Sequence, residues 1–230
     1  MLYDRLVEAI KQHDLGIELN FAPPMPAPWI VLLPRQGHAI VQATHVYGLN
    51  PLDPRSISDA LADARRQAEE LVRALGRLPE LKDIRMVRTA PALGVRESRR
   101  VRGRYRLDVD DLLAGRKFDD GVTTCRFPID IHALKRGEDG AMDQVQPYEV
   151  PYRCLVPEKT PGVLVAGRCI SGSHEAHASY RVTGTCMGMG MAAGLAAALA
   201  VERGVDPAKI DGVELRQRLI ERGVSFDTAW

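Results

Sequence analysis

The first third of the chain alternates apolar and polar positions in patterns that predict a helix, a hairpin and one long amphipathic helix. Apolar residues at helical spacing predict the first helix, and four prolines in eight positions predict an extended connector after it. Two apolar runs around a short turn predict an antiparallel hairpin, and an apolar stripe opposite charged residues predicts the longest helix. These elements are expected at residues 2–12 (helix), 21–28 (connector), 29–33 and 38–49 (strands) and 56–76 (helix, with Ser56 or Ser58 as N-cap and Gly76 at its end).

The middle of the chain predicts extended structure. Residues 100–109 alternate arginine with apolar residues, which is typical of a strand with one charged face. That face is either solvated or an anion-binding wall, and both interpretations stay open. A short capped helix beginning at Asp108, a strand over 123–133 and a polar turn over 138–143 follow.

The last third combines a short apolar segment, a loop and a helix of very small residues. GVLVAG (162–167) predicts a strand buried on both faces, and a loop rich in serine, histidine and glycine runs to Gly184. A helix of alanine, glycine and methionine follows and stops before Gly204. The final helix is expected from Asp211, with Glu214 completing a capping box.

Composition and charge narrow the function classes. The 230 residues are 45% apolar and 27% charged, with a formal net charge of +1, which argues against a dedicated nucleic-acid binder. The four cysteines form no CxxC pair, so zinc-ribbon and thioredoxin motifs are excluded and reduced thiols are expected. The longest apolar run, 186–201, is shorter than the ~20 residues of a spanning helix, and the N-terminus lacks a signal-peptide core. We therefore expect a cytoplasmic protein.

Two short motifs suggest chemistry that their context does not support. TGTCMGMG (183–190) matches the TGxxxGxG string of short-chain dehydrogenases, but a polar segment precedes it and the chain has no YxxxK. HEAH (174–177) has its histidines three apart, so a hydrolytic metal site would need a distant third ligand such as His132 or Asp130. A polar loop that lines a ligand pocket is the favoured interpretation.

The strand, loop and small-residue helix over 162–200 predict a ligand site at the start of that helix. Backbone N–H groups at about residues 185–188 would favour a partial negative charge there. This physical argument indicates an anion or a carbonyl group and does not name the ligand.

Four ordered blocks of the sequence resemble the FAD-dependent oxidoreductase family. The blocks are GVRESRRVRGRYRLDVDDLLAGRKFDDGV (94–122), DIH (130–132), YEVPYRCLVPEKTPGVLVAGR (148–168) and VLVAGRCISGSHEAHASYRVTGTCMGMGMAAGLAAALA (163–200). The resemblance spans about residues 30–203. It implies FAD as cofactor and an α+β or α/β fold, with a mixed-sheet substrate domain plus the C-terminal strand and helix of a Rossmann-like FAD-binding domain.

The resemblance also implies which residues form the site. A strand end beside the ribityl and pyrophosphate region, a helix start under the flavin ring and a loop facing ring and substrate would hold the cofactor. The expected cofactor-binding residues are Ala166, Gly167, Arg168, Arg181, Thr185, Cys186 and Met187. The expected catalytic residues are His132, His174, His177 and Arg96. Two alternatives remain: Arg96 as the ion-pair partner of Glu97 or Asp108, and Cys186 as a small buried residue.

The N-terminal FAD-binding motif of that family, a strand followed by GxGxxG, does not occur in this sequence. The sequence therefore predicts a C-terminal portion, as a fragment, a wrongly assigned start or one subunit of a split enzyme. Its expected parts are a substrate-type α+β domain (1–150), the C-terminal part of the FAD-binding domain (151–204) and a C-terminal helix (205–230).

The expected function is hydride transfer between a small organic substrate and flavin. Expected partners are that substrate and either the missing dinucleotide-binding half or further copies of the chain, with neither nucleic acid nor membrane. The alternative is a catalytically silent binding or structural module that docks to a nucleotide-binding partner.

Overall fold

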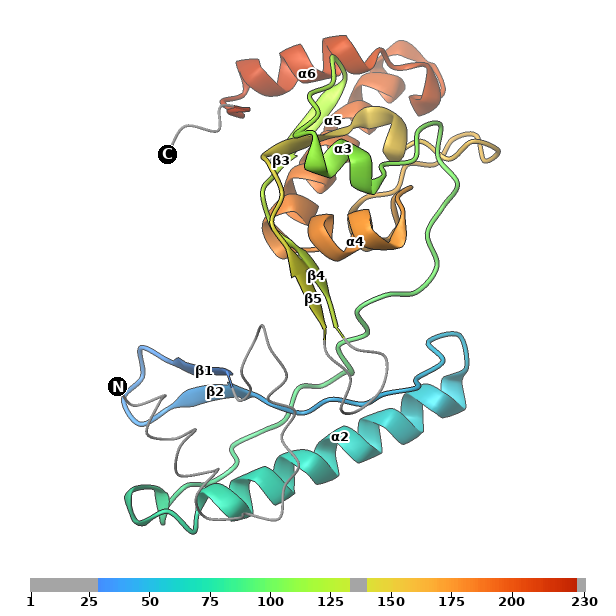
Figure 1. The fold of residues 1–230 in the computed structure, drawn as a ribbon. Coiled ribbons are helices and arrows are strands. Elements are labelled where there is room, and N and C mark those ends of the chain that lie inside the picture. Colours follow the sequence, from blue (N-terminus) through green and yellow to red (C-terminus); the bar gives the residue numbers. More distant parts are fainter. Residues whose placement is uncertain (1–28, 133–139, 227–230) are drawn as a thin grey trace. The chain divides into compact units, whose positions relative to one another are not determined.

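The computed structural model describes residues 29–132 and 140–226 (Figure 1). The predicted helix over 2–12 and connector over 21–28 lie outside the described residues. The chain forms two compact units, Met1–Arg96 with His132–Gly140 and Glu97–Ile131 with Ala141–Trp230. The predicted domain boundary between residues 150 and 151 falls inside the second unit, and the assignment of substrate and flavin segments stays a prediction.

A hairpin and one long helix form the described part of the first unit. Strands β1 (Trp29–Leu32) and β2 (Ala39–Gln42) pair antiparallel, which confirms the predicted hairpin with a shorter second strand. Helix α2 (Pro54–Leu75) confirms the long amphipathic helix, but its N-cap is Asp53, whose carboxylate accepts from the Arg55 N–H, and not a serine. A 3₁₀ turn, η1 (Pro79–Leu81), follows it.

The core of this unit lies between α2 and the segment that follows the hairpin. The Gln67 side chain fixes that segment, because its Oε1 accepts from the His45 N–H at 3.1 Å and its Nε2 donates to the His45 carbonyl at 2.9 Å. The buried apolar residues that pack together here are Ala43, Leu71, Ala74, Leu75 and Leu78. This small cluster confirms the apolar stripe that the sequence predicts for α2.

Two antiparallel strand pairs form the sheets of the second unit. β3 (Gly121–Cys125) pairs with β6 (Tyr148–Pro151), and β4 (Ile129–Ile131) pairs with β5 (Ala141–Asp143). The single strand predicted over 123–133 is therefore wrong. It breaks before β4 at Pro128, because proline has no N–H to donate to a sheet. Part of the predicted polar turn is the strand β5.

The arginine-rich segment over 100–109 is extended but is not a strand. Its backbone forms only isolated bridges, Gly103 to Pro157 and Leu107 to Gly172, because it runs between loop segments rather than beside a strand. The alternation of side chains is largely as predicted, with Leu107 fully buried and three of the four arginines, at 102, 104 and 106, exposed. The fourth, Arg100, is partly buried. The short capped helix is confirmed as α3 (Val109–Leu113), which has a capping box formed by Asp108 and Asp111.

The apolar segment 162–167 does not form the predicted buried strand. Its residues are exposed or partly buried, and its hydrogen bond from the Val165 N–H goes to the Leu155 carbonyl in a loop. An apolar run this short specifies a strand only when a neighbouring strand pairs with it, and none does among the residues described. The Rossmann-like arrangement is therefore not confirmed. The turn η3 (Gly167–Cys169) follows this segment.

The loop predicted before Gly184 contains a helix, α4 (His174–Tyr180). It begins after Ser173, whose Oγ accepts from the Ala176 N–H at 3.1 Å. The serine cap and the small alanines allow a helix where the abundance of serine, histidine and glycine suggested a loop. HEAH therefore lies on a helix.

The C-terminal helices largely follow the sequence prediction. α5 (Thr183–Arg203) ends at Gly204, which has a φ of 64° as a left-handed cap requires. A turn, η4 (Pro207–Lys209), precedes α6 (Gly212–Glu221), which Asp211 caps. The predicted capping box is wrong, because the Glu214 carboxylate accepts from Arg203 instead.

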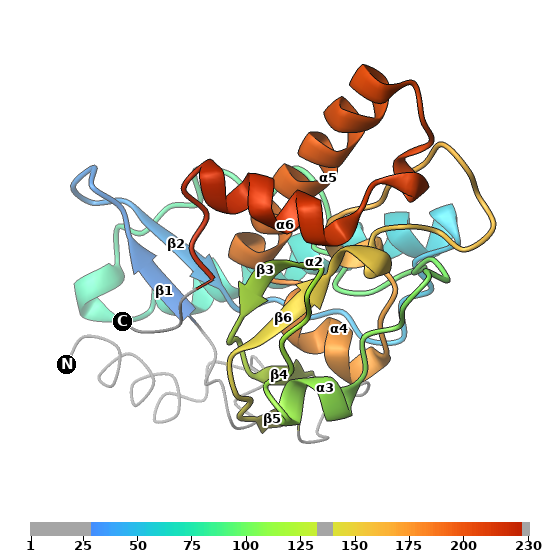
Figure 2. The ribbon, with the colours of Figure 1, turned by 90° about the horizontal axis from the view of Figure 1, so that it is seen from above.

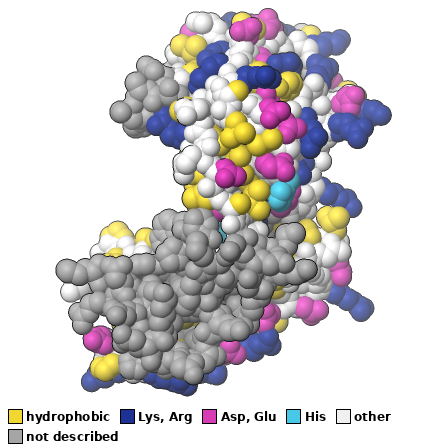
Figure 3. All heavy atoms as spheres, viewed as in Figure 1, with side chains coloured by type: hydrophobic (Ala, Val, Ile, Leu, Met, Phe, Trp, Pro, Cys, Tyr) yellow, Lys and Arg dark blue, Asp and Glu magenta, His cyan; other side chains and the backbone are white. Residues whose placement is uncertain are grey.

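The core of the second unit gathers around β3 and the buried side of α5. α6 packs against β3 (Figure 2), and the turn η2 (Tyr152–Cys154) closes the end of β6. The largest buried side chains include Tyr148, Tyr180, Leu107, Leu155, Ile170 and Met189. On the face of this unit seen in Figure 3, acidic and basic side chains are interspersed around an apolar group. The described residues thus form a mixed α/β structure with two-stranded sheets and five α-helices.

Helix α5 has one buried side and one exposed side. By length and composition alone it is long and apolar enough to cross a membrane, which corrects the shorter estimate from the sequence. Core helices pass the same test, and six residues of α5 are buried. Its exposed side carries only small or apolar side chains from Gly184 to Val201.

Candidate active site

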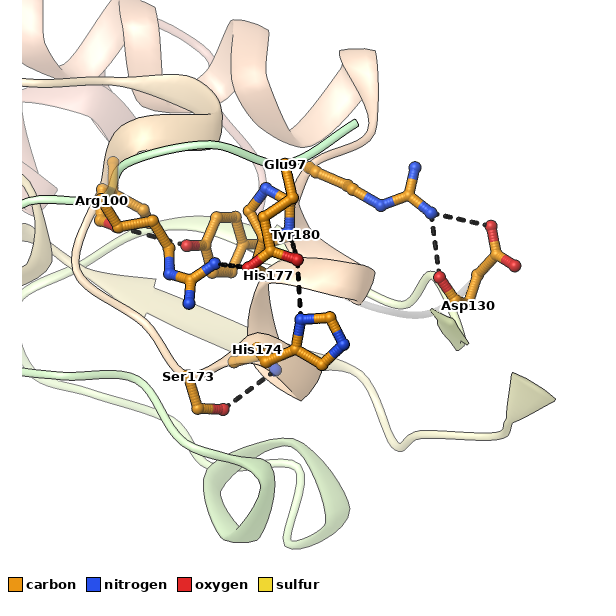
Figure 4. Close-up of polar contacts among 10 residues, drawn as sticks. Glu97, Arg100, Asp130, Ser173, His174, His177 and Tyr180 are labelled. Atoms are coloured by element: carbon orange, nitrogen blue, oxygen red, sulfur yellow. Dashed lines mark hydrogen bonds and ion pairs between the residues drawn. The ribbon is translucent and has the colours of Figure 1, made fainter. Parts of the chain in front are cut away.

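A carboxylate, two histidines and an arginine meet in the second unit (Figure 4). His174 and His177 lie three residues apart on α4, so their rings project from the same side of the helix. Glu97 Oε2 lies 2.7 Å from His174 Nδ1 and 4.0 Å from His177 Nδ1. The other carboxylate oxygen, Oε1, accepts a hydrogen bond from Arg100. One carboxylate thereby joins two segments that are 77 residues apart.

The groups around Glu97 keep its side chain ionised. Burial by itself would raise the pKa of the Glu97 carboxyl. The hydrogen bond and charge of Arg100, with smaller effects from the two histidines, outweigh burial and lower this pKa. Glu97 is therefore negative at neutral pH and can only accept hydrogen bonds.

His177 is the buried member of the group, with 2% of its surface exposed. Its ring meets the Tyr180 ring edge to face, with the centroids 5.5 Å apart. Burial lowers the pKa of His177 to about 4, so the ring is neutral at pH 7. Its Nε2 atom has no hydrogen-bond partner among the described residues.

His174 is the accessible member of the group, with 48% of its side chain exposed. It is the first residue of α4, and the Ser173 cap fixes the backbone from which it projects. Its Nδ1 atom faces Glu97, whereas Nε2 lies on the other side of the ring (Figure 4). A histidine held by one nitrogen and open at the other can exchange protons with a ligand.

Arg181 follows α4 and is held by Asp130, the middle residue of β4. Its Nη2 donates to the Asp130 carbonyl at 2.9 Å and to Oδ2 at 3.0 Å, and both side chains are largely buried. This pair joins the end of α4 to the strand. A cofactor contact of Arg181 stays a prediction.

The start of α5 brings together several of the predicted cofactor-binding residues. Val182 precedes the helix and provides no side-chain cap, whereas an Asp or Ser side chain caps each of the other described α-helices. A Cβ built on Gly167, which has a φ of 84°, would lie 3.7 Å from Cys186 Sγ. A Cβ on Gly184 would meet nothing within 4 Å. The uncapped helix start is thus open beside the turn that contains Gly167.

The remaining predicted cofactor residues lie around the same helix start. Thr185 is buried against the core, Cys186 is partly buried and Met187 is 70% exposed. Ala166, just before η3, is partly buried, and Arg168, within η3, is exposed. Their roles stay predictions.

Two predicted catalytic residues, Arg96 and His132, belong to the first unit. The His132 ring lies 6.1 Å from the ring of His45, whose pKa is lowered mainly by burial. The proposed ion-pair partners of Arg96 bind other arginines, since Glu97 pairs with Arg100 and Asp108 lies 3.9 Å from Arg106. The catalytic roles of Arg96 and His132 stay predictions.

The predicted site residues neither form a metal site nor line the hollow found in the second unit. Within 29–132 and 140–226, no group of three or more histidine, cysteine or acidic side chains could hold a metal ion. A hollow of about 470 Å³ in the second unit is lined by paired charges, among them Asp120 with Arg153, and by none of the predicted site residues.

Sequence reasoning identified both histidines but missed the residues that fix them. Glu97 was considered only as a surface partner of Arg96, and Arg100 only as one of a row of exposed arginines. The signal that could have pointed to them is the dense charge of the RESRR stretch beside an otherwise apolar segment. No local pattern, however, indicates that it meets α4.

The chain matches the family model described as FAD dependent oxidoreductase over residues 9–219, and it belongs to that family. The family implies FAD as the cofactor and a flavin-linked redox role. No curated protein and no solved structure matches the chain. The mixed α/β structure is compatible with a domain of such an enzyme.

Proposed function

We propose that this chain is the C-terminal portion of an FAD-dependent oxidoreductase that transfers a hydride between a small organic substrate and flavin. The observation that carries the proposal is the uncapped start of α5 beside the left-handed Gly167. Free N–H groups at a helix start attract an anion or a polarised carbonyl, and the open position at Gly184 lets a flat ligand approach the backbone. The family match supplies the identity of that ligand.

The residues at this helix start fit the cofactor. Gly167 and Gly184 leave the backbone accessible. The N–H groups of residues 183–185 precede the first hydrogen bond of α5, which runs from the Cys186 N–H to the Val182 carbonyl, and they would hold a negatively polarised part of the flavin. When bound, FAD supplies the hydride acceptor or donor of the reaction. The chain itself supplies orientation and the proton-transfer group.

We assign that proton-transfer role to His174 among the predicted histidines. Its ring is accessible, whereas His177 is buried and neutral. His132 belongs to the other unit. His174 therefore exchanges the proton that accompanies hydride transfer, and His177 supports the structure beneath it.

We further propose that the exposed side of α5 docks onto the dinucleotide-binding half of the enzyme. Its positions recur every three or four residues, so they form one straight charge-free stripe along the helix. The stripe consists of Gly184, Met187, Met191, Gly194, Ala198 and Val201. An apolar helix face of this length is expected to pack against another protein surface.

The four cysteines are all free, which supports a cytoplasmic enzyme.

A pair of matched variants tests the cofactor site. Gly184→Val and Gly194→Val each place a side chain in open space on α5, ten residues or about 15 Å apart. FAD is titrated into the 15N-labelled chain, and we expect weak binding that shifts the amide signals of residues 184–187 and 167. Gly184→Val should abolish these shifts, and Gly194→Val should preserve them. Equal binding by both variants, or shifts confined to other residues, would refute the proposed site.

The docking proposal has a separate test. Co-expression with the polypeptide encoded upstream should give a stable complex that retains flavin through purification. Ala198→Glu should prevent that complex, whereas Ala62→Glu, on the exposed side of α2, should leave it intact. A complex that forms equally well with Ala198→Glu would show that α5 is not the docking face.

A further inference from the structure

The contact between Glu97 and His174 determines which of the two side chains carries the proton of their hydrogen bond. The 2.7 Å separation of Glu97 Oε2 and His174 Nδ1 is a hydrogen bond. An ionised carboxylate has no proton to donate, so Nδ1 must carry the hydrogen. In the neutral ring the lone pair is then on Nε2, on the side of the ring that faces away from Glu97 (Figure 4).

We propose that Glu97 is the positioning residue for His174: it fixes the Nδ1–H tautomer and turns the Nε2 lone pair outward, where it can accept a proton from a ligand. The catalytic meaning of this arrangement rests on the proposed function. The arrangement itself needs neither flavin nor substrate. Nothing in the family match assigns a role to Glu97.

The surroundings of Glu97 explain why this carboxylate can hold a ring in place. Arg100 occupies its Oε1 atom, so Oε2 remains for the histidine. His177 faces the same oxygen at 4.0 Å, beyond hydrogen-bond distance, and stays neutral. Arg181, the other nearby cation, is already bound to Asp130. The strongest contact of Glu97 on α4 is therefore with His174.

The position of His174 at the start of α4 restricts the ring through its backbone. Ser173 caps the helix through the Ala176 N–H, so the Cα of His174 is fixed by the first turn. A ring on a fixed backbone with one nitrogen bound to a carboxylate keeps one orientation. A carboxylate that orients a histidine in this way contributes to proton transfer without touching the substrate.

The tautomer can be measured directly on the whole chain without cofactor. Long-range 1H–15N correlation on protein with 15N-labelled histidine distinguishes a protonated from an unprotonated ring nitrogen. His174→Asn identifies the signals. At about pH 8.5, two units above the ordinary pKa of histidine, we expect His174 to be almost entirely the Nδ1–H form.

Matched variants separate positioning from a general loss of charge. In Glu97→Gln the amide can donate as well as accept a hydrogen bond, so it does not require a proton on Nδ1. The Nδ1–H form should therefore fall to a minority. Glu158→Gln, at an exposed carboxylate, should leave the tautomer unchanged. A His174 ring that is Nε2–H in the wild type, or Nδ1–H to the same extent in Glu97→Gln, would overturn the proposal. The wild-type spectrum decides the question even if Glu97→Gln fails to fold.

This outcome is independent of the proposed function. If His174 shows the expected tautomer but the complex with the upstream polypeptide retains no flavin, the redox proposal fails and the positioning of His174 by Glu97 stands. If the complex retains flavin but His174 shows the other tautomer, the positioning role of Glu97 fails and the redox proposal stands. In the flavin-loaded complex, loss of an oriented proton-transfer group should lower the rate of substrate oxidation by about 100-fold or more.

Discussion

Replacing Arg216 by alanine should strongly destabilise the second unit, because it leaves a buried carboxylate without its cation. Arg216, on α6, donates to Glu149 Oε2 at 2.9 Å and to Oε1 at 3.0 Å, and it also donates to the Gly121 carbonyl at 3.0 Å. The Glu149 side chain, on β6, is only 2% exposed. The guanidinium also lies 3.8 Å from the centre of the Phe226 ring. After the substitution, Glu149 would keep the hydrogen bond from the Phe118 N–H at 3.1 Å.

The magnitude follows from the burial of the two partners. Removing one partner of a buried ion pair costs about 3–5 kcal/mol. Arg216 is itself 22% exposed, so water can partly replace it and the lower value, about 3 kcal/mol, is expected. For a unit of about 125 residues, each kcal/mol corresponds to about 4 °C in the unfolding midpoint. The expected loss is therefore about 12 °C.

The control is the exposed pair of Arg203 and Glu214, whose side chains are 39% and 32% exposed. Arg203→Ala should leave the unfolding midpoint nearly unchanged, because an exposed ion pair contributes little to stability. Unfolding is followed by calorimetry, with hydrogen exchange of β3 and β6 peptides to assign the transition to the second unit. Adding Glu149→Gln to Arg216→Ala should recover part of the loss, because position 149 then no longer carries a buried charge without a cation. An Arg216→Ala variant as stable as Arg203→Ala would refute the reasoning.

Three further outcomes are expected. The pKa of His177 is about 4 in the folded chain and ordinary after unfolding, so the stability that depends on its neutral ring is complete above about pH 6.5 and decreases as the pH falls towards 4. In urea unfolding between pH 7 and pH 5, the free energy of unfolding of the wild type should therefore fall by about 2 kcal/mol more than that of His177→Phe. Equal losses would contradict this. The chain alone should self-associate through α5, and light scattering should show smaller particles for Ala198→Glu than for Ala62→Glu. Gly103→Ala should destabilise the second unit in thermal unfolding, because the added Cβ would lie 2.7 Å from the Cβ of Ser171; an unchanged midpoint would show that the neighbouring loop yields.

Much of the local structure could be predicted because its causes lie close together in the sequence. The hairpin, the amphipathic α2, the capped α3 and the end of α5 at Gly204 each depend on residues within a few positions of one another. Patterning and capping act over that range. The family, with FAD as its cofactor, could likewise be recognised from ordered motifs.

The tertiary structure decided the features that depend on distant partners. The apolar segment 162–167 reads as a strand, but no strand pairs with it among the described residues, so it stays extended beside Leu155. The HEAH motif reads as a loop, but the Ser173 cap and burial against the core make it a helix. In both cases the available partners, rather than propensity, determine the conformation.

The candidate site shows the same division between sequence and structure. The sequence by itself indicated the candidate residues, above all His174 and the glycine-rich start of α5. Only folding placed Glu97 and His174 within 2.7 Å of each other across 77 residues, and set Gly167 beside Cys186. A contact between residues far apart in the chain leaves no periodic trace in either segment, because periodicity records the face that a segment buries and not the partner that it meets.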